Sequence, residues 1–386
     1  TLDILCINKF GPYSNAITGM NAAEILDYLH EKGFNVGFLC MNAVYRATIG
    51  VQCHPKAYPV WQMRTLFDSD RKNLRLFLCL LNGLLLFLKS KRIRHRTVIV
   101  MTDPPLLFLW FQLFRHSPRI RLGYFAMDVF PDAFVAGKYI KPNNVFYRII
   151  EKIVYSRPPD FLISLGSGQR NFLMSKFRSK PVSIITTSGL TPAIPQCLYR
   201  KVPSERISFG YLGNLGEAHD EHFVMQFIES LNPRKHIMYL NVYGTKSKIL
   251  LSAIKHNPAV VVCDAVPLND FCSIDISVVS LLSGWKHICI PSKAITSIFC
   301  GCAVLLNVSS DSDLWSKLSE AGWHIPPGDN YHDAINQFLS DLDHHEIIAK
   351  RKAALRIARC FQRIKKKSFK TFASLLRNSY TDSSCR

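Results

Sequence analysis

The chain has 386 residues, more than one ordinary hydrophobic core accommodates, and we expect two domains. Hydrophobic residues make up 48% of the sequence and aromatic residues 11%, which excludes a disordered chain. The formal net charge of +20 indicates an anionic partner, which could be nucleic acid, an anionic lipid surface or a phosphorylated substrate.

The first half alternates predicted strands and helices with short connections. Strands are expected at 2–8, 34–40, 97–101, 120–126, 160–165 and 182–186, and helices at 22–32, 73–88 and 145–155. This alternation predicts a doubly wound parallel sheet in a first domain over residues 1–189. Residues 190–204 contain Pro192, Pro195 and Pro203 without periodicity, and we interpret them as a linker.

Two apolar runs in this half, residues 74–88 and 106–114, are each followed by basic residues. These basic residues are Lys89, Lys91, Arg92, Arg94 and Arg96 after the first run, and Arg115, Arg119 and Arg121 after the second. The first run is shorter than the roughly 20 residues that a membrane span needs. Apolar faces with basic flanks favour helices lying on an anionic membrane surface, and buried helices with solvated basic ends are the alternative.

The second half repeats the scheme in a second domain over residues 205–345. Strands are expected at 206–212, 237–242, 259–263, 274–280 and 303–307, and helices at 221–231, 246–256, 292–300, 312–321 and 331–339. Two such α/β domains would face a cleft at the carboxyl ends of their strands, where ligands bind.

The tail, residues 346–386, is basic and has apolar residues at helical spacing. Residues 347–381 contain eleven Lys or Arg and no acidic residue. We expect one or two amphipathic helices that pack back on the first domain, and membrane contact through the basic face is a further possibility.

The twelve cysteines form no Cys-x-x-Cys pair and no Cys/His spacing typical of zinc, and most lie in apolar runs. We expect buried free thiols in a reducing cytosol. No signal peptide is recognised, because a predicted strand begins at Leu2.

A glycine turn in the second domain is the strongest local signal. The apolar run 207–212 ends at Gly213-Asn214-Leu215-Gly216, and a helix is expected to begin near Asp220. Bare N–H groups at the positive end of such a helix bind phosphate oxygens. No Walker sequence follows, and a tight turn without a ligand is an equal alternative.

Further along, Pro291 and Ser292 mark the start of another predicted helix. Lys293 then lies in the first turn, where a cation is unfavourable unless an anion also binds there. Lys286 and His287 stand just upstream on the connecting loop. These residues are candidate phosphate ligands, although a lone lysine is ordinarily a solvated surface charge.

Two features of the first domain are candidates as well. Gly11 and Gly19 bracket the loop after the first strand, which we interpret either as a loop covering the cleft or as an irregular connection. Asp128 follows the strand at 120–126, and Asp132 comes four residues later. These carboxylates suit sugar hydroxyls or a base, and the alternative is a helix cap with turn formers.

Three segments, GYLGNLGEAHD, SLLSGWKHICIPSKAITSIFCGCAVLL and AGWHIPPGD, occur in the order seen in family-4-type retaining glycosyltransferases of the GT-B fold that build bacterial polysaccharides. The segment MDVFPDAFVAG also resembles their Asp-x-x-Pro-Asp segment. The resemblance covers almost the whole chain and implies two Rossmann-like domains.

By this resemblance, Gly213, Asn214 and Gly216 line a diphosphate, Ser292 and Lys293 contact phosphate or ribose, and Asp128 lies near the reacting sugar. The chain departs from the family pattern in two respects. The Glu-x7-Glu motif of many relatives is missing, with Lys286 or His287 near the place of its first Glu and Ser297 at that of its second, and Glu217 stands where many have Arg.

The resemblance predicts a cytoplasmic enzyme, peripherally bound to the inner face of the cell membrane. It would transfer a sugar from a nucleotide-diphosphate sugar to a polyprenyl-diphosphate-linked saccharide in capsule, exopolysaccharide or O-antigen synthesis. We expect no metal or other cofactor, and no nucleic acid, since the chain has no nucleic-acid-binding motif. A nucleotide-sugar epimerase and a non-catalytic glycosyltransferase-like subunit are the alternatives.

Overall fold

The computed structural model describes residues 1–43, 55–66, 72–114, 119–189, 206–254, 256–264 and 270–382. The chain divides into two compact units. Unit 1 comprises Thr1–Ser188 and Ile364–Arg386, and unit 2 comprises Gly189–Arg363. The predicted linker, residues 190–204, lies outside the described residues.

Unit 1 contains a seven-stranded parallel sheet in the order β3-β2-β1-β4-β5-β6-β7. The strands are β1 (Leu2–Phe10), β2 (Val36–Met41), β3 (Val60–Met63), β4 (His95–Val100), β5 (Arg121–Phe125), β6 (Phe161–Ser164) and β7 (Val182–Ile185). Strand order reverses between β1 and β4, and the carboxyl ends of these two strands therefore form the switch point where ligands bind in such sheets.

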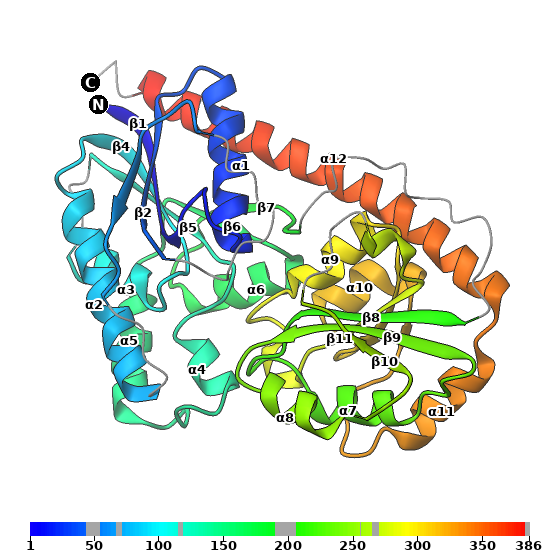
Figure 1. Ribbon diagram of the computed structural model, residues 1–386. Helices are drawn as coiled ribbons and strands as arrows, with labels where there is room; N and C mark the ends of the chain where they lie inside the picture. The colour runs from blue at the N-terminus through cyan, green and yellow to red at the C-terminus, as the bar shows by residue number, and fades with distance from the viewer. Residues whose placement is uncertain are drawn as a thin grey trace. The chain divides into compact units, whose positions relative to one another are not determined.

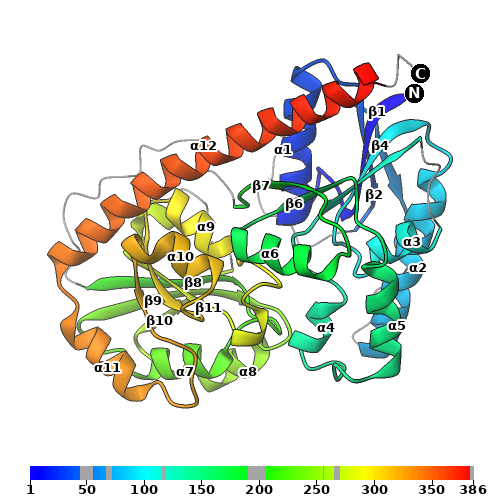
Figure 2. The ribbon, with the colours of Figure 1, turned by 180° about the vertical axis from the view of Figure 1, so that it is seen from behind.

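The helices of unit 1 cover both faces of this sheet. They are α1 (Ile17–Glu31), α2 (Lys72–Ser90), α3 (Leu107–Leu113), α4 (Asp132–Ala136), α5 (Val145–Val154) and α6 (Ser167–Lys176). Figures 1 and 2 show α2, α3 and α5 side by side on one face and α1 on the other. Among the described residues, no helix combines the length and the hydropathy needed to cross a bilayer.

Unit 2 contains a six-stranded parallel sheet in the order β10-β9-β8-β11-β12-β13. The strands are β8 (Ile207–Asn214), β9 (His236–Tyr243), β10 (Val260–Val262), β11 (Ile276–Ser280), β12 (Ala303–Asn307) and β13 (Gly322–His324). The order reverses between β8 and β11, as it does in unit 1. The prediction of two doubly wound parallel sheets is confirmed.

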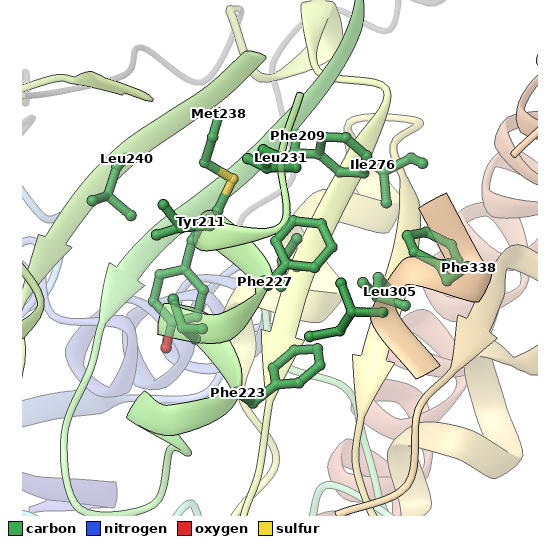
Figure 3. Close-up of a cluster of buried hydrophobic side chains, with 14 of the residues drawn as sticks. Phe209, Tyr211, Phe223, Phe227, Leu231, Met238, Leu240, Ile276, Leu305 and Phe338 are labelled. Carbon is green, nitrogen blue, oxygen red and sulfur yellow. The ribbon is translucent and has the colours of Figure 1, made fainter. Parts of the chain in front are cut away.

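The helices of unit 2 are α7 (Glu221–Glu229), α8 (Ser247–Ala253), α9 (Ser292–Phe299), α10 (Asp313–Leu318) and α11 (His332–Asp341), with short 3₁₀ turns at Asp270–Ser273, Ser283–Trp285 and Ser319–Ala321. Figure 1 shows α7, α8 and α11 on one face of the sheet and α9 and α10 on the other. A cluster of buried side chains fills the first face: Phe209 and Tyr211 from β8 meet Phe223, Phe227 and Phe338 from the helices (Figure 3). This packing fixes the end of β8, where the glycine turn lies.

The basic tail forms a single helix, α12 (His344–Asp382). Up to Arg363 it belongs to unit 2, where Phe361 packs on Phe299 at 6.4 Å between ring centroids. From Ile364 onward it belongs to unit 1, where Phe372 packs on Phe161 at 5.0 Å. Several apolar side chains of the helix are buried, among them Phe361, Phe369, Phe372 and Leu376, whereas Ile364 is exposed. The helix packs back on the first unit as expected.

Candidate functional site

The glycine turn follows β8 directly. The strand pairs with β9 as far as Asn214 opposite Tyr243, two residues beyond the predicted end of the strand. Gly213 has φ of +131°, a conformation that residues with a Cβ rarely adopt. A Cβ on Gly216 would lie 3.1 Å from the side-chain amide of Asn214. The glycines therefore allow a sharp exit from the strand.

Gly244, which the sequence reasoning did not single out, supports this turn from the end of β9. Its φ is +107°, and a Cβ there would lie 2.1 Å from Asn214 Oδ1 and 2.9 Å from the Leu215 carbonyl oxygen. Leu215 N donates to the Tyr243 carbonyl at 2.6 Å, and Lys246 N donates to the Leu215 carbonyl at 3.1 Å. A glycine directly after a strand was the available signal for Gly244.

The N-terminus of α7 differs from the expectation of bare N–H groups. The Asp220 carboxylate accepts hydrogen bonds from His222 N at 3.0 Å and Phe223 N at 3.1 Å. The Tyr331 hydroxyl donates to its other oxygen at 2.6 Å. Because a buried carboxylate already caps this helix, its N-terminus is unfavourable for phosphate.

The N-terminus of α9 has the opposite character. Buried Pro291 precedes it without a side-chain cap, and no acidic residue lies in its first turn. Half-buried Ser292 begins the helix, and Lys293 Nζ donates to the Asn214 carbonyl oxygen at 2.6 Å and to the Tyr211 hydroxyl at 2.8 Å. The same ammonium lies 4.0 Å from the centroid of the Tyr211 ring. A helix N-terminus, a lysine and the glycine turn thus converge.

The electrostatics of this place favour an anion. Within the described residues, no carboxylate forms an ion pair with Lys293, and burial lowers the pKa of its ammonium well below the ordinary value. Burial, and then the charge of Lys293, also lowers the pKa of His219. The neighbouring Lys246 is neutralised by Glu221 at 2.5 Å. A bound anion would supply the missing negative charge.

The structure brings Gly213, Asn214 and Lys293 together, and Gly216 adjoins Asn214. Lys286 is instead engaged by Asp311, with 2.5 Å between Nζ and Oδ2. This contact holds the pKa of the exposed Asp311 carboxyl at about 2. His287 follows on the same turn and is half-buried.

Two carboxylates follow neighbouring strands of unit 1: Asp103 follows β4, at the switch point, and Asp128 follows β5, the next strand along. Thr18 Oγ1 donates to Asp103 Oδ2 at 2.9 Å, and Asn8 Nδ2 donates to Thr18 at 3.2 Å. Burial, and then the charge of Asp103, raises the pKa of Asp128 to about 7. Asp128 can therefore exchange a proton near neutral pH.

Asp103 was missed by the sequence reasoning. It lies just beyond the predicted strand at 97–101, a position that the reasoning used for Asp128 alone. Burial raises the pKa of Asp103 too, while the hydrogen bond from Thr18 opposes the shift.

Asp132 has a structural environment. It is buried at the start of α4, and its oxygens accept hydrogen bonds from the Tyr155 hydroxyl at 2.5 Å and the Tyr147 hydroxyl at 3.3 Å. Lys176 Nζ forms an ion pair with it at 2.8 Å. This network holds α4, α5 and α6 together, so Asp132 has a structural role. It is not the helix cap that was the alternative, because Pro131 precedes α4 and no side chain caps this helix.

Gly11 and Gly19 are needed for close packing at the start of α1. A Cβ on Gly11 would lie 2.5 Å from Cys40 Sγ, and a Cβ on Gly19 would lie 2.5 Å from the Gly11 carbonyl oxygen. Each position therefore has a packing reason for its glycine, whatever else the loop contacts.

In the described part of the chain, no three His, Cys, Asp or Glu side chains are grouped so that they could hold a metal ion. The cysteines described there are free, and five of them are buried: Cys6, Cys40, Cys289, Cys300 and Cys302.

Comparison with known proteins gives one curated relative and several solved structures. No family model matches the sequence. The chain is 22% identical over 267 residues, 63% of its length, to the probable glycosyltransferase WbjE of Pseudomonas aeruginosa. The match spans 65% of the length of that relative.

The solved structures resemble the whole chain at low identity. Sucrose-phosphate synthase of Thermosynechococcus elongatus gives a TM-score of 0.70 at 13% identity, over 98% of this chain and 100% of that one. Anabaena HepE, solved in complex with UDP and glucose, gives a TM-score of 0.66 at 12% identity, over 97% of this chain and 100% of that one. WaaG, a glycosyltransferase involved in lipopolysaccharide biosynthesis, gives a TM-score of 0.65 at 14% identity, over 95% of this chain and 98% of that one. The chain therefore has the GT-B fold of these glycosyltransferases.

Proposed function

We propose that this protein is a retaining, family-4-type glycosyltransferase. It moves a sugar from a nucleotide-diphosphate sugar to a polyprenyl-diphosphate-linked saccharide during synthesis of a bacterial surface polysaccharide. The observation that carries the proposal is the Lys293 ammonium, which lies without an ion-pair partner among the described residues, beside the glycine turn and the uncapped start of α9. The likeness to WbjE, WaaG and UDP-bound HepE supports the reaction class and the donor.

The donor diphosphate binds in unit 2. Its oxygens accept hydrogen bonds from Lys293 Nζ and from the first N–H groups of α9, beginning at Ser292. The side-chain-free surfaces of Gly213 and Gly216 leave room for phosphate beside Asn214. Lys286 stays outside this set, because it already pairs with Asp311. His287 remains a candidate ligand on the neighbouring turn.

Transfer breaks the bond between the anomeric carbon and the diphosphate oxygen and forms a bond from that carbon to an acceptor hydroxyl oxygen. The hydroxyl proton passes to the departing diphosphate oxygen, on the same face of the sugar, so the configuration is retained. Lys293 and the α9 amides stabilise the charge that develops on the diphosphate. Asp128, in unit 1, accepts a hydrogen bond from a second, non-reacting hydroxyl of the acceptor saccharide and orients the acceptor.

The acceptor lipid places the protein at the cytoplasmic face of the membrane, as a peripheral enzyme. Since an ammonium and helix amides supply the positive charge at the diphosphate, we expect transfer to continue in the presence of a chelator.

The test is a transfer assay with UDP-, GDP- and dTDP-sugars and a short-chain polyprenyl-diphosphate saccharide, with product stereochemistry read by NMR. The expected product has the anomeric configuration of the donor, and Lys293→Ala lowers kcat/KM at least 100-fold while the circular dichroism spectrum is kept. Epimerised donor formed without acceptor would identify an epimerase instead. Absence of binding to every nucleotide would identify a non-catalytic subunit.

A further inference from the structure

Helix α5 of unit 1 presents an apolar face to solvent. Val145, Phe146 and Ile149 are 73%, 63% and 52% exposed. Their spacing of one and three residues places them on one side of the helix, whereas Tyr147 and Val154 point into the core and are buried. The sequence reasoning looked for such a face in residues 74–88 and 106–114 and did not single out α5.

Basic side chains surround this face. Lys138, Lys141, Arg148 and Lys152 are exposed. The single acidic residue between positions 138 and 152 is Glu151, whose Oε1 is neutralised by Lys176 Nζ at 2.6 Å. An apolar stripe between cations, without a free carboxylate, complements a surface of anionic headgroups over acyl chains.

The helix is held rigidly in this orientation. Tyr147 and Tyr155, both on its inner side, donate to the buried carboxylate of Asp132, which Lys176 also contacts. In the segment that follows α5, the carbonyl oxygen of Arg157 accepts a hydrogen bond from Gln112 Nε2 on α3 at 2.8 Å. The exposure of the apolar face is thus built into unit 1 and does not depend on a loose segment.

The neighbouring helices α2 and α3 also have exposed apolar side chains. In the layer formed by α2, α3 and α5 (Figures 1 and 2), Phe77 and Leu88 of α2 and Leu113 of α3 are also exposed. Lys89, Lys91 and Arg92 follow Leu88 directly. The layer of helices that contains α5 therefore carries further exposed apolar side chains, and basic residues follow one of them in the sequence.

We propose that this face of α5, with Lys138 and Lys141 before it, docks on an anionic lipid surface. Val145, Phe146 and Ile149 enter the region between headgroups and acyl chains, while Arg148 and Lys152 contact lipid phosphates. This inference rests on the proposed function, since a lipid-linked acceptor requires the enzyme at the membrane. The face and Asp128 belong to the same unit of the chain.

A second copy of the chain is the rival occupant. A symmetric dimer through this face would set the same patch against itself. Arg148 and Lys152 would then meet their own counterparts without an available carboxylate, which is unfavourable. Anionic lipid has the complementary charge.

Vesicle sedimentation of the 386-residue chain tests the surface, with phosphatidylcholine vesicles that contain either 30% phosphatidylglycerol or none. We expect at least tenfold more binding to the anionic vesicles. Phe146→Ser with Ile149→Ser, and separately Arg148→Glu with Lys152→Glu, should each reduce it at least tenfold. Ile249→Ser on α8, where the side chain is 62% exposed, is the matched control and should bind as the unaltered protein does.

Unchanged binding of both double variants would overturn the proposal, as would equal binding to neutral vesicles. A dimer in light scattering that the serine variant dissociates would assign the face to self-association and also overturn it. Transfer to a short water-soluble acceptor separates this from the proposed function. Vesicle binding without any transfer refutes the function alone, and transfer without vesicle binding refutes the surface alone.

Discussion

The ammonium of Lys293 lies 2.6 Å from the main-chain carbonyl oxygen of Asn214, and this contact joins the first turn of α9 to the glycine turn after β8. A carbonyl carries only partial negative charge and does not neutralise a lysine. Asp220 caps α7 nearby, so α9 rather than α7 offers its N-terminus. In the proposed function a bound anion accounts for a cation at a position where the helix dipole disfavours one.

Asp128 should make the stability of the protein depend on pH. Its pKa is about 7 in the folded protein and 3.8 ordinarily, so the folded state binds more protons between these values. The free energy of unfolding therefore falls as pH rises from 4 to 7, and the penalty is complete above 7. Urea unfolding at pH 4.5 and pH 8 checks this with Asp128→Asn, which does not titrate. From the lower to the higher pH, the unfolding free energy of the variant should rise relative to that of the unaltered protein by on the order of 2–4 kcal/mol. A pH-independent difference would contradict the shift.

Asp103 should set the pH dependence of transfer. If Asp128 must be ionised to orient the acceptor hydroxyl, the rate rises through a midpoint of about 7. Asp103→Asn removes the like charge that raises the pKa of Asp128, and the midpoint should move to lower pH. Initial rates between pH 5 and 8.5 give both midpoints. Asp333→Asn, on an exposed position of α11, should leave the profile in place.

Gly244→Ala should disturb the glycine turn from outside it. The added methyl would collide with Asn214 Oδ1 and the Leu215 carbonyl, and φ of +107° is unfavourable for alanine. We expect nucleotide affinity to fall about tenfold or more and stability to fall by about 1–3 kcal/mol. Gly328→Ala is the matched control, because open space surrounds that glycine. Equal effects of the two variants in titration calorimetry would refute the role of Gly244.

How far the sequence predicts this protein depends on the range of the contacts involved. Apolar runs predicted both sheets, because a parallel strand that is buried on both faces is a continuous run of hydrophobic residues in the sequence. The edge strands β3 and β13 were missed, since their sequences, Val-Trp-Gln-Met and Gly-Trp-His, are not the apolar runs that marked other strands of the same length. The phosphate was first assigned to α7, because the sequence does not tell whether Asp220 turns inward to cap that helix.

The site required contacts between distant segments. Lys293 was found from its position at a helix start, yet its partners Tyr211 and Asn214 lie about 80 residues earlier and follow only from the order β8-β11. Asp103 became a candidate only because Asp128 follows the next strand of the sheet. The structural role of Asp132 depends on hydrogen bonds from tyrosines 15 and 23 residues away. The structure supplies these neighbours.

Asp132→Asn should test the network that supports α5. The substitution removes the charge facing Lys176 and weakens two tyrosine hydrogen bonds in a buried place. We expect a loss of about 2–4 kcal/mol in urea unfolding. Tyr155→Phe, which removes one of these bonds, should lose less. Asp132→Asn with unaltered stability would contradict the structural assignment of this carboxylate.

Titration calorimetry with UDP, GDP and dTDP, on the unaltered protein and on Lys293→Met, tests the central claim most directly. We predict that one of the three binds with 1:1 stoichiometry and that Lys293→Met weakens this binding 10- to 100-fold, the cost of about 1.5–3 kcal/mol for losing a hydrogen bond from a charged group. Lys248→Met, on an exposed position of α8, should bind as the unaltered protein does. Binding that survives Lys293→Met unchanged, or no binding of any of the three, would contradict the account.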